Sequence, residues 1–263
     1  MAQVINTNLY TNTAQMYLNK NSSSLSNAIT RLSSGLRVNS SRDDAAGLAV
    51  ATRMEADSRG LTVAIRNAAD GNSFGETADA ALGTVADILQ RMRELSVQSL
   101  NGTISDTERG YLDKEYATLN QQITDLQGAA TLNNQNVFST FSFQVGTTST
   151  QSMGATFTSV AAVGGSVSTS AGAAAAMSAI DAALVSVATN RAVVGSVMSA
   201  LDFRITQLNA AKTNQDAARS RIMDADFASE TANMSRAQIL QQSGTAMVAQ
   251  ANQIPQNVLT LLR

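Results

Sequence analysis

The amino-acid sequence predicts a mainly α protein whose two ends form a long, coiled-coil-like helical bundle, with a small β-hairpin region at mid-chain. Three observations support this fold class. Small and apolar residues recur at alternating steps of three and four near both termini, which is the spacing of a coiled-coil seam. The same rhythm returns in the interior of the chain. Strand-like alternation is confined to one stretch near the middle.

The C-terminal stripe predicts a helix over residues 237–261. At about 1.5 Å per residue, a helix of ~25 residues would be roughly 38 Å long and could not bury its own apolar edge. Pro255 lies inside this stripe, and we expect a local kink or fraying there. The stripe consists of Ala237, Leu240, Gly244, Met247, Ala251, Ile254, Val258 and Leu261.

The N-terminal segment carries a matching stripe, so we expect the two terminal helices to pair. Two helices cover only part of each other's apolar surface. The pair is therefore either part of an ordinary bundle core within one subunit, or a seam that other copies of the chain complete. We favour the second interpretation. The predicted self-assembly seam is Leu25, Ile29, Leu32, Leu36, Leu240, Met247, Ile254, Val258 and Leu261.

The interior sequence predicts three more helices. The first begins near Asp44 and continues to about Leu100, with Asp70-Gly71-Asn72 as a turn or a tolerated weak position. Ser105 and Glu108 have the spacing of a capping box and open the second helix. The third runs from Ile180 to Leu208. Arg191 interrupts its stripe, either as the partner of a carboxylate across the seam or, as we favour, as a surface Arg.

The middle of the chain has a different composition, with no charged residue between Leu126 and Ile180. Phe141, Phe143 and Val145 alternate with polar residues, and the alternation resumes at Met153. The segment 146–152 between them is typical of a turn. This pattern predicts a β-hairpin within residues 137–172.

The composition argues against an enzyme. The chain has no His and no Cys, the usual ligands of zinc, haem and copper and the usual nucleophiles and bases of catalytic dyads. The paired carboxylates, Asp43-Asp44 and Asp224-Ala225-Asp226, lie near predicted helix starts, where capping explains them better than acid–base chemistry. We therefore expect no catalytic residue, no metal and no cofactor.

The charge pattern and the N-terminal segment exclude other classes of partner. A net charge of −2 gives no indication of nucleic-acid binding. The first residues lack the basic and apolar regions of a secretory signal peptide, and no stretch approaches the ~18 apolar residues of a membrane span. We expect no membrane insertion, and a chain that is soluble or leaves the cell without a cleaved signal.

Three separated motifs resemble bacterial flagellin, the subunit of the flagellar filament. Residues 31–54, RLSSGLRVNSSRDDAAGLAVATRM, are similar to the N-terminal signature of that family. Residues 90–103, QRMRELSVQSLNGT, resemble the next signature, and residues 220–263 the C-terminal one. The motifs occur in the family's order on both sides of the middle.

The resemblance implies a secreted, extracellular subunit that polymerises through its terminal helices into the flagellar filament for swimming motility. Residues 1–43 and 221–263 would form an inner coiled-coil domain, and residues 44–220 an outer helical domain with the hairpin. The large outer domains of many flagellins would be missing. Implied partners are further copies of the chain, the flagellar export apparatus, an export chaperone, and the filament cap and hook-junction proteins.

The resemblance also implies a contact with a vertebrate toll-like receptor, at positions that match Arg91, Leu95 and Glu115. Within the same class, a hook–filament junction protein is the alternative, and the motifs DDAAGLAV and IPQNVLTLL favour the filament subunit. A secreted helical effector or a hydrolase would need a reactive constellation that the sequence lacks. A metalloprotease insertion would need His.

Overall fold

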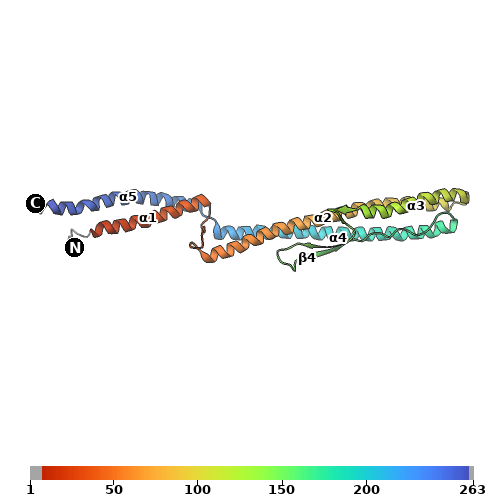
Figure 1. Cartoon of the computed structure of the whole chain (residues 1–263), viewed down its shortest axis with the longest axis horizontal. Helices are drawn as coiled ribbons and strands as arrows, with labels where there is room; N and C mark the ends of the chain where they lie inside the picture. Colours follow the sequence, from red (N-terminus) through yellow and green to blue (C-terminus); the bar gives the residue numbers. More distant parts are fainter. Residues whose placement is uncertain (1–7, 261–263) are drawn as a thin grey trace. The chain divides into compact units, whose positions relative to one another are not determined.

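The computed structural model describes residues 8–260, with side chains up to Gln253. Within this range the chain is mainly α-helical, as predicted, and two short antiparallel hairpins follow the third helix (Figure 1). The elements in chain order are α1 (Leu9–Ser34), α2 (Ala45–Ser99), α3 (Asp106–Ala129), β1 (Thr131–Leu132), β2 (Gln135–Asn136), β3 (Thr140–Gln144), β4 (Ser152–Thr156), α4 (Ser170–Met223) and α5 (Phe227–Thr260).

The chain divides into two compact units. Unit 1 combines Met1–Ala56 with Asn214–Arg263, and unit 2 is Asp57–Thr213. Helices α2 and α4 each contribute residues to both units, because both boundaries fall inside them. Each unit is described separately below.

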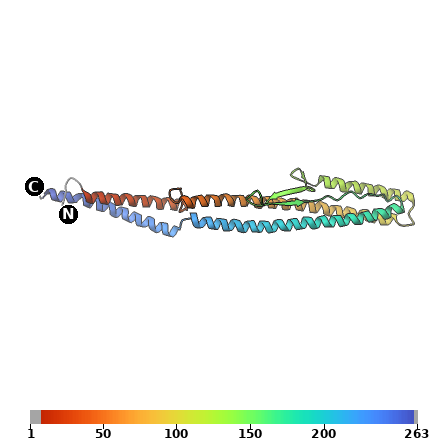
Figure 2. The same ribbon diagram turned by 90° about the horizontal axis from the view of Figure 1, so that it is seen from below.

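In unit 1, α1 and α5 lie side by side in opposite directions (Figures 1 and 2). The side chain of Asn8 caps the start of α1 by accepting from the Thr11 amide at 3.2 Å. Gly35 ends the helix with φ of 71°, a left-handed conformation that a residue with a Cβ rarely adopts. A short β-bridge between Leu36 and Asp224 then joins the two chain segments. Beside it lies a small core of Val38, Ala51 and Met223.

Unit 2 is built around an apolar core shared by α2, α3 and α4. The predicted stripe on α2 is confirmed, since Ala78, Leu82, Val85, Leu89 and Met92 are completely buried. From Ile180 to Leu208, the buried positions on α4 recur at every seventh residue, and the positions between them are half-buried or exposed. This heptad set on α4 is Ile180, Val187, Val194, Leu201 and Leu208.

Gly71 lies inside α2, so Asp70-Gly71-Asn72 does not form a turn. A Cβ at Gly71 would lie 3.0 Å from Leu201 Cδ1 and 3.3 Å from the Phe143 ring. The glycine therefore lets α4 and the hairpin approach α2 closely, which offsets its low helix propensity.

The predicted hairpin is confirmed as β3 paired with β4, with Phe141 opposite Ala155 and Phe143 opposite Met153. The Phe74 ring of α2 packs against Phe141, with 4.7 Å between ring centroids.

A second hairpin, β1–β2, was not predicted. Its turn residues, Asn133 and Asn134, have φ of 50° and 62°, the left-handed pair that a two-residue turn requires. Asn tolerates this conformation better than other residues with a Cβ, because its short side chain can form local hydrogen bonds.

An extended segment after β4 docks along α3 through three heptad-spaced side chains. Each accepts a hydrogen bond from a valine amide, and the three valine side chains are buried in the core of unit 2. The segment thus has backbone partners without belonging to a sheet. The contacts are Gln127 Oε1 with the Val160 amide at 2.6 Å, Asn120 Oδ1 with the Val163 amide at 2.9 Å, and Asp113 Oδ1 with the Val167 amide at 2.7 Å.

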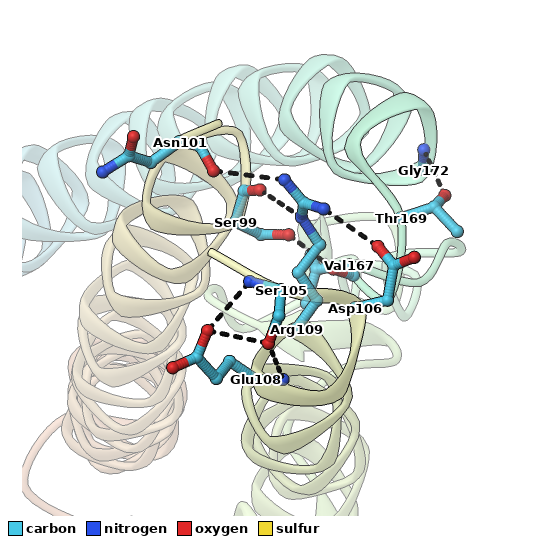
Figure 3. Close-up of polar contacts among 9 residues, drawn as sticks. All are labelled: Ser99, Asn101, Ser105, Asp106, Glu108, Arg109, Val167, Thr169 and Gly172. Atoms are coloured by element: carbon cyan, nitrogen blue, oxygen red, sulfur yellow. Dashed lines mark hydrogen bonds and ion pairs between the residues drawn. The ribbon is translucent and has the colours of Figure 1, made fainter. Parts of the chain in front are cut away.

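Figure 3 shows the junction where α2 ends and α3 begins. The predicted capping box is confirmed: the Ser105 amide donates to Glu108 Oε2 at 2.8 Å, and Ser105 Oγ accepts from the Glu108 amide. The bonds that the Glu108 carboxylate accepts, first from the Ser105 amide and then from the Ser105 hydroxyl, lower the pKa of Glu108. Arg109 donates to the carbonyl oxygens of Ser99 and Asn101, at 2.8 and 3.1 Å, and so caps the C-terminal end of α2.

Arg191 lies on the surface, as favoured, and it also pairs with Asp79, with Nε–Oδ1 at 2.8 Å and Nη2–Oδ2 at 3.1 Å, so both interpretations hold in part.

The expectation that no stretch could span a membrane needs correction. An 18-residue window of α4 is apolar enough to cross a membrane by length and composition, with a mean hydropathy of 1.6. Only 22% of this window is buried, and a single helix of this kind is weak evidence for a membrane span.

Candidate self-assembly surface

The contact between α1 and α5 is held by side-chain amides that reach backbone carbonyls across the pair. Asn8 Nδ2 donates to the Ala251 carbonyl at 2.9 Å, and Asn21 Nδ2 donates to the Ala237 carbonyl at 2.7 Å. The Ala237 carbonyl already accepts a bond within α5, so Asn21 adds a second bond that depends on register. The Ala251 carbonyl lies four residues before Pro255, which has no N–H to donate, so Asn8 supplies a donor that the helix itself lacks there. The two contacts lie at separate points along the pair and fix how α1 and α5 align.

An ion pair adds a third fixed point. Arg31 Nη1 lies 3.0 Å from Glu230 Oε1, and the Glu230 side chain is only 12% exposed. A carboxylate this enclosed needs a charged or hydrogen-bonding partner. Arg31 supplies one, so the pair opposes any sliding of α5 along α1.

Small residues set the distance between the two helices. The buried apolar positions in the pair are Ala28, Ala237 and Ala251, exposed by 4%, 5% and 8%. A Cβ at Gly244 would lie 2.9 Å from Leu18 Cδ1, so the absence of a side chain there lets α1 come close. Close helices with small residues between them bury little apolar area.

Large apolar side chains of the pair therefore remain on its surface. Tyr17 and Met247 are both 63% exposed, although each could bury much more area than any of the three alanines. Exposed apolar residues at this density on one structural element indicate an interaction surface. The exposed set is Leu9, Tyr10, Met16, Tyr17, Ile29, Phe227, Ile239, Leu240 and Met247.

Part of this set lines an open groove between α1 and α5 with a volume of about 840 Å³, which we call the terminal groove. Among the described residues that line it, Lys20 is the one with a charge. The groove is otherwise apolar or neutral, which suits a protein surface better than a charged ligand. Its lining residues are Tyr10, Thr13, Ala14, Tyr17, Leu18, Lys20, Asn21, Ser24, Leu240, Ser243, Gly244 and Met247.

The predicted seam residues fall into three groups. Leu25, Leu32 and Leu36 are half-buried. Ile29, Leu240 and Met247 are exposed. The side chains of Ile254 and Val258, and the whole of Leu261, lie outside the described residues.

The polar contacts of the pair were not predicted. Asn8, Asn21 and the Arg31–Glu230 pair are ordinary helix-surface residue types, and nothing in their spacing marks them as partners. Tyr10 and Tyr17 were not predicted either, although their seven-residue separation is a sequence signal for one helix face.

The residues expected to contact a receptor lie on unit 2, and their surroundings differ. Arg91 donates to Glu94 Oε2 at 2.9 Å and to Glu115 Oε1 at 2.9 Å, and these bonds, with Glu94 first, raise the pKa of Arg91. Leu95 is completely buried in the core, so its side chain is not exposed for the contact that the resemblance implies at this position. It faces inward because it follows Met92 by three residues on the same buried stripe of α2.

One carboxylate of each predicted pair caps a helix start, as predicted. Asp44 Oδ1 accepts from the Gly47 amide at 2.8 Å at the start of α2. Asp226 Oδ1 accepts from the Ala228 amide at 3.0 Å at the start of α5. Among the described residues, no three acidic side chains gather as a metal site would require.

Asp43 holds the turn that precedes α2. Its carboxylate accepts from the Ser40 hydroxyl and from the amides of Asn39 and Ser40. These hydrogen bonds, first the one from the Ser40 hydroxyl, lower the pKa of Asp43. All the bonds are local, so this carboxylate has a structural role in the connection between α1 and α2.

Comparison with known protein families gives two matches that together span most of the chain. Residues 5–142 match the bacterial flagellin N-terminal helical region, and residues 177–262 match the bacterial flagellin C-terminal helical region. The segment between the two matches contains β4 and the extended segment that docks on α3.

Full-length relatives agree with the family matches. The chain is 39% identical to a flagellin of Halalkalibacterium halodurans, covering 99% of this chain and all of the relative. It is 36% identical to a flagellin of Listeria monocytogenes, covering 98% of this chain and 99% of the relative. Its alignment with flagellin A of Vibrio anguillarum is 32% identical and extends over 381 positions, so that relative contains many residues that this chain lacks.

A solved structure is similar as well. The crystal structure of Bacillus cereus flagellin matches with a TM-score of 0.50 and 28% sequence identity, covering 59% of this chain and 94% of that one. The likeness supports the helical architecture.

Proposed function

Because the chain belongs to the bacterial flagellin family, and is therefore a structural subunit of the flagellar filament, we propose that it polymerises through the surface of the α1–α5 pair. It is a short form of the family. The observation that carries the proposal is the exposure of the large apolar side chains on this pair, beside an open groove of about 840 Å³.

Covering these side chains provides the driving force. Each large apolar side chain that passes from water into an interface contributes roughly 1.5–3 kcal/mol when it becomes fully buried. Part of this gain is offset by the ordering of side chains and backbone. A second copy of the chain can cover these side chains with a different face of its own α1–α5 pair, and such heterologous contacts extend a filament when the rotation between copies does not close a ring.

The domain assignment follows from the same surface. In the proposed filament, residues 1–43 and 221–263 form the inner layer, and residues 44–220 form the outer layer. The self-assembly seam includes Leu25, Leu32 and Leu36 along with the exposed residues of the pair. Ile254, Val258 and Leu261 continue the seam by their spacing in the sequence.

The experiment is to change one exposed aromatic residue of the groove. Tyr17→Ser should leave the helical content of the monomer unchanged and abolish or greatly slow filament formation, measured by sedimentation and electron microscopy. Tyr111→Ser is the matched control, because Tyr111 on α3 is 65% exposed and lies in unit 2. Normal polymerisation of Tyr17→Ser would contradict the proposed surface.

The remaining partners follow from the filament role. We propose that the subunit reaches the cell exterior through the flagellar export apparatus with an export chaperone, and meets the cap and hook-junction proteins at the two ends of the filament. The role is structural, without catalysis. The hook–filament junction alternative predicts short assemblies, whereas a filament subunit polymerises without limit, so the length of assemblies formed from the pure chain separates the two.

We further propose that the monomer contacts a vertebrate toll-like receptor through Arg91 and Glu115, whose side chains are each close to half-exposed and join α2 to α3. Leu95 has an indirect role in this proposal, because its buried side chain packs in the core of unit 2 and holds α2 in position. Replacing both charged residues by Ala should then weaken receptor signalling by the monomer. Arg93→Ala is the matched control, since Arg93 lies on the same helix and pairs with Asp181 instead. Unchanged signalling by the double variant would remove this role.

A further inference from the structure

Two of the described methionines differ from the others in their exposure. Met16 on α1 is 61% exposed and Met247 on α5 is 63% exposed, whereas Met92 and Met223 are buried and the remaining described methionines are half-buried. A thioether in contact with water is open to two-electron oxidation. The oxygen atom passes from a peroxide to sulfur, so that R–S–R′ and H2O2 give R–S(=O)–R′ and H2O.

The two exposed methionines occupy different surroundings. Met247 lines the terminal groove with Tyr17, Leu18 and Leu240, and Met16 is not part of that lining. Near-equal exposure outside the groove makes Met16 the comparison that separates the terminal groove from the rest of the exposed set.

We propose that Met247 is an oxidation-sensitive position that controls polymerisation, and that its sulfoxide blocks assembly without unfolding the subunit. The inference rests on the proposed function of the terminal groove. In the free subunit the sulfoxide oxygen is hydrated, so the fold is unaffected. When a second copy covers the groove, that oxygen loses water and meets a mainly apolar lining.

The direction of the effect follows from the polarity of the two side-chain forms. Methionine is flexible and apolar and adapts to the surface that covers it. The sulfoxide carries a strong hydrogen-bond acceptor, and an unsatisfied buried acceptor weakens association by about tenfold or more. Methionine sulfoxide reductases return the thioether, so the block is reversible.

The test compares three purified chains before and after treatment with hydrogen peroxide: the wild type, Met247→Leu and Met16→Leu. Mass spectrometry of peptides gives the extent of oxidation at each position, and sedimentation gives the critical concentration for polymerisation. Oxidation should raise the critical concentration of the wild type and of Met16→Leu by about tenfold or more. On the same treatment, the critical concentration of Met247→Leu should rise much less than that of Met16→Leu, because Leu cannot be oxidised and the remaining exposed methionine, Met16, lies outside the groove.

Met247→Gln provides a second variant that needs no oxidant. Its amide places a polar group at the same position, and it should raise the critical concentration while leaving the far-UV spectrum of the monomer unchanged. Equal oxidation sensitivity of Met247→Leu and the wild type would overturn the inference, as would normal assembly of a wild-type chain shown to carry the Met247 sulfoxide. Failure of the untreated wild type to polymerise would instead contradict the proposed function.

Discussion

The α1–α5 pair and the core of unit 2 are both built from long helices with apolar stripes, yet they use their apolar residues in opposite ways. In unit 2, large side chains such as Leu82, Leu89 and Met92 are completely buried. In the pair, the buried apolar positions are alanines, and large side chains such as Tyr17 and Met247 face outward. The difference shows that a coiled-coil stripe predicts a helix contact but does not say whether the contact lies within one chain or between copies.

The number of helices that surround each stripe explains the difference. In unit 2, α3, the hairpin and the extended segment cover the surface that α2 and α4 leave open. The α1–α5 pair has no third element of this kind among the described residues of unit 1 beyond the short bridge at Leu36. Two helices alone cannot enclose a core, so the pair keeps an exposed apolar surface, the one through which we propose that the chain assembles.

The largest effect is expected from removing the C-terminal end of the seam. A chain truncated after Gln253 lacks Ile254, Val258 and Leu261 and should not polymerise, because the seam residues that only other copies and α1 can cover are gone. Its central helices should melt at nearly the same temperature as those of the full chain. Filament growth and swimming of cells that export the truncated chain measure the first expectation, and circular dichroism of the monomer measures the second. Loss of the central fold would favour the interpretation as an intramolecular core.

Hydrogen exchange sharpens the comparison without any mutation. In dilute monomer, the amides of α1 and α5 should exchange at least about a thousandfold faster than those around Leu89 and Ile180, because little apolar area holds the pair together. Polymerisation should slow exchange in α1 and α5 and leave unit 2 nearly unchanged. Equal protection of both regions in the monomer would contradict the view that assembly completes the pair.

Matched leucine substitutions test the same contrast as free energies. Leu89→Ala removes a completely buried side chain and should lower the free energy of unfolding by about 2–5 kcal/mol, measured by urea denaturation. Leu240→Ala removes a side chain that is 52% exposed and should change that free energy by less than about 0.5 kcal/mol. The order should reverse for polymerisation, where Leu240→Ala raises the critical concentration. Similar effects of both variants on unfolding would mean that Leu240 belongs to a closed core.

Much of the helical architecture could be predicted from the sequence, because helix periodicity, capping boxes and strand alternation are local signals. The capping box at Ser105 and the β3–β4 hairpin belong to this class. The β1–β2 hairpin was missed because Asn133-Asn134 is a weaker turn signal than Asn-Gly. The docking of Val163 on Asn120 was missed because it joins segments that are distant in sequence.

The site was harder to predict, because a stripe gives periodicity without giving burial. The seam residues Ile29 and Leu240 lie on the apolar edges that the spacing indicates, but only the structure shows them exposed. Leu95 is the converse case. The family motif associates Leu95 with a receptor contact. Leu95 nevertheless follows Met92 by three residues, and this spacing places it on the buried face of α2.

The smallest effect is expected from the ion pair between Asp79 and Arg191, which joins α2 and α4 at the surface of unit 2. The hydrogen bond from Arg191 lowers the pKa of Asp79 below its ordinary value of 3.8. A depressed pKa in the folded state means that the pair stabilises the fold above pH 3.8 and that this contribution is lost as the pH falls through the lower, folded-state pKa. Because both side chains are close to half-exposed, Asp79→Asn should lower the free energy of unfolding by less than about 1 kcal/mol at pH 7. Urea denaturation of the wild type and the variant at pH 7 and at pH values below 3.8 measures the difference, which should shrink towards zero in acid. A difference that persisted in acid would show that Asp79 contributes through its packing rather than through its charge.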